Sequence, residues 1–228
     1  MPASPPHATN ESVEPAVLVS FRPRDASTDF KAHKHAWTEL QARSLGIPFV
    51  TKYIGAEPTF EESYRRAIRE LHDDYDIATL VTGDIEDVGE GFMDRAVGNT
   101  GVELVRPLWK RPRMEILELL RIFDISYIVT LTRLEKLPKP VSERLLGSVI
   151  TKEFLLDQFK WYDENYEPLD LLNTVDLAGE YGEMHSMVRD CPMFSAVVEC
   201  GGVENKVHET KYGSYMYIEP ASLEFLPK

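Results

Sequence analysis

The residues best suited to chemistry are gathered in the segment 179–186, which reads Gly-Glu-Tyr-Gly-Glu-Met-His-Ser. It holds two carboxylates, Glu180 and Glu183, and the imidazole of His185. Its two glycines let the backbone turn sharply and come close to a ligand. The same composition also fits an acidic turn that leads into a strand starting near Ser186. The residues by themselves leave both interpretations open.

A second candidate group follows the apolar run 77–82, where Gly83 and Asp84 stand at the expected end of a strand. In open α/β sheets, ligands bind beyond the carboxyl ends of the strands. A carboxylate at Asp84 could order a loop, hold a magnesium ion on a nucleotide, or cap the following turn, and capping is the favoured interpretation without further information. Trp109 follows the next expected strand, and a tryptophan beside proline and apolar residues usually serves packing.

Several common catalytic motifs are absent from the sequence. The segment 20–27 after the first expected strand has no glycine to cradle phosphate, and Pro23 lacks a backbone donor. Arg22 and Arg24 in that segment could still contact phosphate. There is no nucleophile elbow, and Cys191 and Cys200 have no paired spacing typical of a metal site.

Strand and helix patterns alternate over the first part of the chain and must position these groups. Strands are expected at 16–21, 49–54, 77–82, 102–105 and 125–131, with helices at 33–45, from 58 onward, at 91–97 and at 113–123. Such alternation predicts a parallel, doubly wound α/β sheet with right-handed crossovers.

The pattern of predicted strands and helices changes after Leu134. The proline-rich segment 136–140 is typical of a linker, 151–166 is a predicted helix, and 194–225 predicts short strands separated by glycine turns at 201–202 and 212–213. We therefore expect a disordered tail at 1–12, a first domain at 13–134 and a smaller α+β domain at 135–228.

Composition limits the possible functions. The chain has 228 residues, 43% of them hydrophobic, which suffices for a real core. A net charge of −13 argues against general nucleic-acid binding. No run is long enough to span a bilayer, and few cysteines and no secretory h-region indicate a reducing, cytoplasmic setting.

The motifs taken together, in their order and spacing, resemble the diphthine-ammonia ligase family over roughly residues 15–225. The matching segments are Leu40-Gln41-Ala42 with Leu45-Gly46-Ile47-Pro48, Gly83-Asp84-Ile85, Pro107-Leu108-Trp109, Leu146-Gly147, and Gly179-Glu180-Tyr181-Gly182-Glu183 with Pro192-Met193-Phe194.

The resemblance implies a nucleotide-α-hydrolase-like (HUP) adenylation domain, N-terminally incomplete here, followed by the substrate domain. It also implies a reaction with ATP and Mg²⁺, in which the diphthine carboxylate on elongation factor 2 becomes an acyl adenylate and pyrophosphate leaves. Ammonium then supplies the nitrogen of the diphthamide amide, and AMP is released.

Residue by residue, the resemblance places Glu180, Glu183 and His185 in catalysis, where carboxylates could orient an ammonium ion or take a proton. It places Gly83, Asp84 and Arg95 at the nucleotide. The substrate side receives Gly182, Ser186 and Trp109.

One departure from the family keeps alternatives open. The chain contains no Ser-Gly-Gly-Lys-Asp-Ser pyrophosphate loop, and its first expected strand aligns best with the family's second. Without the missing strand, its neighbours must pair directly, or the strand 16–21 must occupy its place. The alternatives are a non-catalytic binding module that has lost nucleotide chemistry, or a truncated gene model whose first exon carried the loop.

Overall fold

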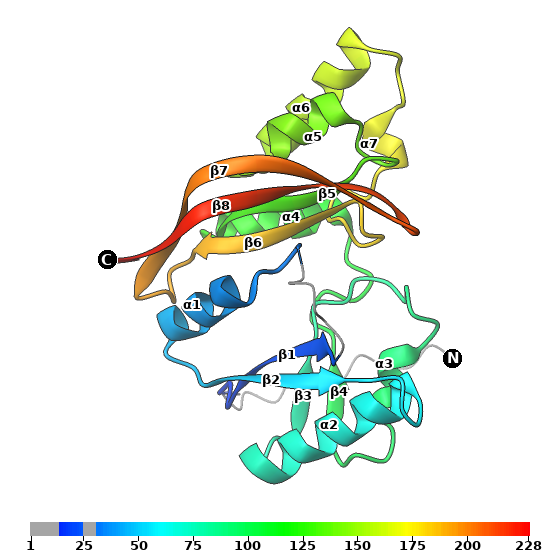
Figure 1. Ribbon diagram of the computed structural model, residues 1–228, viewed down its shortest axis with the longest axis vertical. Helices are drawn as coiled ribbons and strands as arrows, with labels where there is room; N and C mark the ends of the chain where they lie inside the picture. The colour runs from blue at the N-terminus through cyan, green and yellow to red at the C-terminus, as the bar shows by residue number, and fades with distance from the viewer. Residues whose placement is uncertain (1–13, 25–30) are drawn as a thin grey trace.

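A computed structural model describes residues 14–24 and 31–228 of the chain. The predicted disordered tail at 1–12 lies outside these residues, as does most of the segment that follows the first strand. Figure 1 shows the fold, with parallel strands in the first half and a longer antiparallel sheet in the second.

The first half is built from two parallel strand pairs and their helices (Figure 1). Its elements are β1 (Leu18–Pro23), α1 (His35–Leu45), β2 (Phe49–Ile54), α2 (Phe60–Tyr75), β3 (Thr79–Val81), α3 (Phe92–Val97) and β4 (Glu103–Val105). Local signals explain the boundaries: Gly46 ends α1 with φ 70°, and the Thr59 hydroxyl accepts a hydrogen bond from the Glu62 amide at the start of α2.

The two strand pairs do not join into one sheet, which corrects the prediction of a continuous doubly wound sheet. Within the described residues, β1 pairs only with β2, and β3 pairs only with β4. β1 and β3 therefore do not pair directly. Val19 and Phe21 of β1 instead pack their side chains against a cluster that includes Leu80 of β3. Contact between the two pairs is thus made by apolar side chains.

The second half is an antiparallel sheet in the order β6-β5-β8-β7. Its strands are β5 (Ser126–Arg133), β6 (Met184–Asp190), β7 (Ala196–Thr210) and β8 (Gly213–Pro227). The helices around it are α4 (Arg113–Ile122), α5 (Lys139–Leu145), α6 (Lys152–Asn165) and α7 (Leu171–Thr174). The predicted linker 136–140 therefore contains the beginning of a helix.

β5 corrects a second expectation, because it was predicted as a strand of the parallel sheet. It runs antiparallel to both β6 and β8. Six of its eight residues are buried, since α1 covers one side of the sheet and α5 and α6 cover the other (Figure 1). A strand covered on both faces shows the same continuous apolar run in either kind of sheet, so its sequence could not decide between them.

The largest core of the molecule lies in this second half. It joins Trp37 of α1 with Val129 of β5 and Phe159 of α6, each at most 2% exposed. α1, which precedes the second half by many residues, thus packs onto the C-terminal sheet. The division into domains at 13–134 and 135–228 stays a prediction. β5 lies within the predicted first domain, just before its boundary, but it belongs to the C-terminal sheet.

A long hairpin replaces the predicted short strands. β7 and β8 pair from Ala196 with Pro227 to Thr210 with Gly213, and the turn lies at 211–212. The expected turn at Gly201-Gly202 is wrong, because both glycines lie within β7. Gly202 has φ 62°, and a Cβ on it would lie 2.9 Å from the Cβ of Ala221 on β8. The glycine serves close strand packing at this position.

Candidate functional site

The two predicted site segments meet in the structure. One carboxylate oxygen of Glu180 accepts hydrogen bonds from the backbone amides of Ile85, at 2.9 Å, and Glu86, at 2.8 Å. The loop after β3 is thereby attached to the loop before β6. Glycine at 182, with φ 77°, allows the tight turn that brings Glu180 and Glu183 to different neighbours. Gly182 itself does not approach another group within 4 Å of where a Cβ would stand.

Arg113 at the first position of α4 strengthens this junction. Its Nε donates to Oδ2 of Asp176 at 2.7 Å, and its Nη1 lies 3.4 Å from Oε1 of Glu86. The guanidinium therefore bridges the loop before β6 and the loop after β3. Sequence reasoning missed Arg113. The available signal was a cation in the first turn of a helix, where the helix dipole favours acidic residues.

Glu183 is the most buried of the predicted catalytic residues, with 2% of its surface exposed. Its Oε2 accepts a hydrogen bond from the Tyr181 amide at 3.0 Å. The side chain lines an open cavity of about 440 Å³. The other lining residues are Arg113, Lys136, Leu172, Asn173, Thr174, Val175, Asp176, Leu177 and Tyr181.

Asp84 lies in a separate polar cluster at the ends of β3 and β4. Its Oδ2 accepts a hydrogen bond from the Thr82 hydroxyl at 2.8 Å and lies 3.4 Å from Nε of Arg106. Arg106 also pairs with Asp94, and its guanidinium carbon lies 4.5 Å from the centre of the Trp109 ring. Trp109 thus packs on an arginine that holds Asp84.

The structure does not bring Arg95 to Asp84. Arg95 is 51% exposed and pairs with Glu61 of α2, with its Nε 3.0 Å from Oε2. The arginine beside Asp84 is Arg106, which stands directly after β4 and could have been identified because parallel strand ends meet at one edge. Gly83, the residue directly before Asp84, is exposed.

His185 has a different neighbour from the two glutamates. Its ring meets that of His33 edge to face, with the ring centres 5.2 Å apart. Nδ1 of His33 lies 3.2 Å from the Met187 sulfur. Burial, with the adjacent His185 and Arg22, lowers the pKa of His33 to about 4, and burial also lowers the pKa of His185. Both rings are therefore neutral at pH 7, and Ser186, the next residue, is exposed.

The described residues do not form a ready-made nucleotide or metal site. The two amides at the end of β3 that could face an anion are taken by the Glu180 carboxylate. Arg106 is held between Asp84 and Asp94, so the Asp84 carboxylate already faces the guanidinium of an arginine. No group of three or more His, Cys, Asp or Glu side chains suited to a metal ion occurs in this part of the chain.

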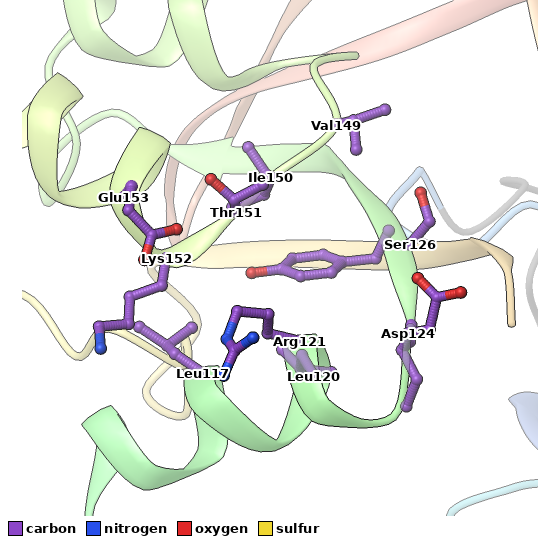
Figure 2. A pocket seen from close by; sticks show the side chains of 12 residues that line it. Leu117, Leu120, Arg121, Asp124, Ser126, Val149, Ile150, Thr151, Lys152 and Glu153 are labelled. Atoms are coloured by element: carbon purple, nitrogen blue, oxygen red, sulfur yellow. The ribbon is translucent and has the colours of Figure 1, made fainter.

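A smaller cavity of about 240 Å³ opens elsewhere, between the end of α4, the start of β5 and the start of α6 (Figure 2). Leu117, Leu120 and Ile150 give it an apolar lining. Arg121 and Lys152 at its rim both pair with Glu118. Its two cationic side chains are thus paired within the protein, and none of the predicted site residues lines it.

The antiparallel sheet with its helices, and the Glu180–Glu183 loop before β6, coincide with a known protein domain. A family model for the diphthamide synthase C-terminal domain matches residues 114–223. The match supports membership of the chain in the diphthine-ammonia ligase family, as the motifs predicted. No curated protein matches the chain. Within the described residues, no helix is both long and apolar enough to cross a membrane.

Proposed function

We propose that the protein carries out the amidation of diphthine to diphthamide on elongation factor 2, through an acyl adenylate made from ATP with Mg²⁺. The observation that carries this proposal is the match of residues 114–223 to the diphthamide synthase C-terminal domain, which suggests a role in diphthamide synthesis. The matched part contains Glu180, Glu183 and Arg113's partner Asp176.

In this proposal, Glu183 has a chemical role, and Glu180 and Arg113 have positioning roles. Glu183 presents a carboxylate to the cavity, where it orients ammonium or takes a proton as the amide forms. Glu180 and Arg113 hold the loop after β3 against the loop before β6, so they position the two sides of the site. ATP would supply the activation of the carboxylate. A catalytic role for His185 would require the 31–34 segment to move, because its ring faces His33.

The test is a direct assay. Purified protein with ATP, ammonium and diphthine-bearing elongation factor 2 should release AMP and pyrophosphate. Glu183→Gln should abolish this release without lowering the melting temperature, because the amide oxygen can still accept the hydrogen bond of Tyr181. Glu167→Gln, at an exposed position, is the matched control. A large loss of melting temperature in Glu183→Gln would make that residue structural.

The second candidate function is a non-catalytic module that binds the modified elongation factor. Occupation of the Ile85 and Glu86 amides by Glu180, and of Arg106 by two carboxylates, favours it. Calorimetry separates the two candidates. Tight, magnesium-dependent ATP binding contradicts the module, whereas binding of diphthine-bearing elongation factor 2 without ATP binding supports it.

A further inference from the structure

The cavity of about 240 Å³ beside α4 is apolar and formed in advance of any ligand. Figure 2 shows the side chains of Leu117 and Leu120 on one side and that of Ile150 on the other. Leu117 and Ile150 are buried, and the Ile150 amide donates a hydrogen bond to the Tyr127 carbonyl at 3.0 Å. The hydroxyl of Thr151, the next residue, caps the start of α6. Packing and hydrogen bonds therefore fix both walls.

Tyr127 supplies a polar group inside this apolar cavity. Its side chain lines the cavity, and the residue is only 9% exposed. Within the part of the chain that the structure describes, its hydroxyl has no hydrogen-bond partner. A buried tyrosine normally places its hydroxyl against a partner, because burial of an unpaired hydroxyl is costly. Burial raises the pKa of Tyr127 to about 12, so the hydroxyl stays protonated at pH 7 and can donate to a ligand.

The rim of the cavity favours a ligand without net charge. Arg121 and Lys152 both pair with Glu118. Asp124 and Glu153 also line the cavity, and neither forms an ion pair within the described residues. Two cations thus stand against three carboxylates, so the rim does not attract an anion. The two unpaired carboxylates are exposed to water, and a cation would gain little from them.

The volume of the cavity sets the size of that ligand. A cavity of about 150 Å³ with an apolar lining is large enough for benzene. The cavity beside α4 has about 240 Å³, so it takes a ring of that size with a short substituent. One acceptor oxygen on the substituent would satisfy the Tyr127 hydroxyl, which apolar atoms cannot do.

We propose that this cavity is a binding site for a small, uncharged, mainly apolar molecule, namely a ring with a short substituent that bears one acceptor oxygen. The ring packs between α4 and the segment 149–151, and the Tyr127 hydroxyl donates a hydrogen bond to the oxygen. None of the residues assigned to the amidation of diphthine lines this cavity. The site therefore goes beyond the proposed function and does not rest on it.

Three probes of nearly the same shape test the site by NMR on protein labelled at its isoleucine methyl groups. Acetophenone has the ring and the acceptor oxygen, α-methylstyrene has a methylene group in place of that oxygen, and benzoate carries a negative charge. Acetophenone should shift the methyl resonances of Ile125 and Ile150, which line the cavity, and bind in the millimolar range typical of so small a molecule. Absence of these shifts, or equally tight binding of benzoate, would overturn the proposal.

Tyr127→Phe isolates the hydrogen bond to the ligand. The melting temperature should not fall, because the hydroxyl that is removed has no partner among the described residues. Acetophenone should bind to the variant about fivefold more weakly than to the wild-type protein, whereas α-methylstyrene should bind equally to both. Tyr53→Phe, at an exposed tyrosine of β2, is the control. Unchanged binding of acetophenone, or equal weakening of the two probes, contradicts the role of Tyr127.

A second variant tests the cavity itself. Val149 is exposed at the rim, so Val149→Trp should place a ring over the opening and abolish the shifts that both neutral probes cause. Val207→Trp, at an exposed position on β7, should leave the shifts unchanged. Shifts that persist in Val149→Trp would contradict binding in this cavity.

Sedimentation separates a small ligand from a second copy of the chain as the occupant. Ile122 and Phe123 are exposed at the end of α4, next to lining residues of the cavity, and a contact between two copies would cover them. We expect acetophenone to shift the Ile150 resonance without changing the sedimentation of the protein. A dimer whose Ile150 methyl group does not respond to acetophenone would overturn the proposal in favour of a contact between copies.

Discussion

At the scale of single residues, the His33–His185 pair makes stability depend on pH. The pKa of His33 is about 4 in the folded protein against 6.5 ordinarily, chiefly because the ring is buried. The unfolded chain therefore binds a proton at a higher pH than the folded chain. The contribution of His33 is fully present above about pH 6.5 and is lost as pH falls toward about 4.

Comparison of a variant with the wild-type protein isolates this effect from the titration of the carboxylates. Urea unfolding between pH 8 and pH 4 should show a smaller loss of unfolding free energy in His33→Gln than in wild type, by roughly 3 kcal/mol. His208→Gln, at an exposed position on β7, should follow the wild-type curve. Parallel curves for all three proteins would contradict the assignment.

Residue types in the candidate site could be predicted from the sequence, but not all of their partners. Glu180, Glu183 and Asp84 were selected because carboxylates stood beside glycines and at a strand end. Arg95 follows only from the resemblance to the family, as a displaced counterpart of an arginine on a helix, and the structure pairs it with Glu61. Which arginine reaches Asp84 depends on how α3 and β4 are rotated in space, and sequence spacing does not contain that information.

At the scale of secondary structure elements, Ser44 joins α1 to the start of β7 through two hydrogen bonds of its hydroxyl. The hydroxyl of Ser44 donates to the Ala196 carbonyl at 2.6 Å and accepts from the Ala196 amide at 2.9 Å, and Ser44 is 2% exposed. Ser44→Ala should lower the unfolding free energy by about 2 kcal/mol, because it leaves buried polar groups without partners. Ser148→Ala, whose hydroxyl bonds within its own turn to Arg144, should change it far less. Equal losses on urea unfolding would contradict this role.

Element boundaries were more predictable than their assembly. Helix starts at Thr59 and Thr151 follow from local capping, in which each hydroxyl accepts a hydrogen bond from the backbone amide three residues on. The partner of β5 is not a local property, since antiparallel pairing with β6 and β8 joins segments far apart in the chain. The same limit explains why α1 was placed with the first half although it packs on the C-terminal sheet.

At the scale of the whole molecule, the loop after β3 is attached to the C-terminal half mainly through polar contacts. Glu180 accepts from the amides of Ile85 and Glu86, and Arg113 reaches Glu86 from the start of α4. The backbone amides of Ile85 and Glu86 thus depend on the second half for their hydrogen-bond acceptor. If the loop moved away from β6, both amides would lose their hydrogen bonds to the Glu180 carboxylate at the same time.

Hydrogen exchange measures this attachment directly. Glu180→Ala should speed amide exchange at Ile85 and Glu86 at least tenfold, because both amides lose their acceptor and the loop opens locally. The unfolding free energy should fall by about 1.5–3 kcal/mol, the range expected for lost hydrogen bonds to a charged group. Glu167→Ala should leave both amides protected. Exchange that remains slow in Glu180→Ala would show that packing of Ile85, which is 4% exposed, holds the loop without the carboxylate. In that case, Glu180 would be free to act on the substrate, and its loss should reduce activity without changing exchange.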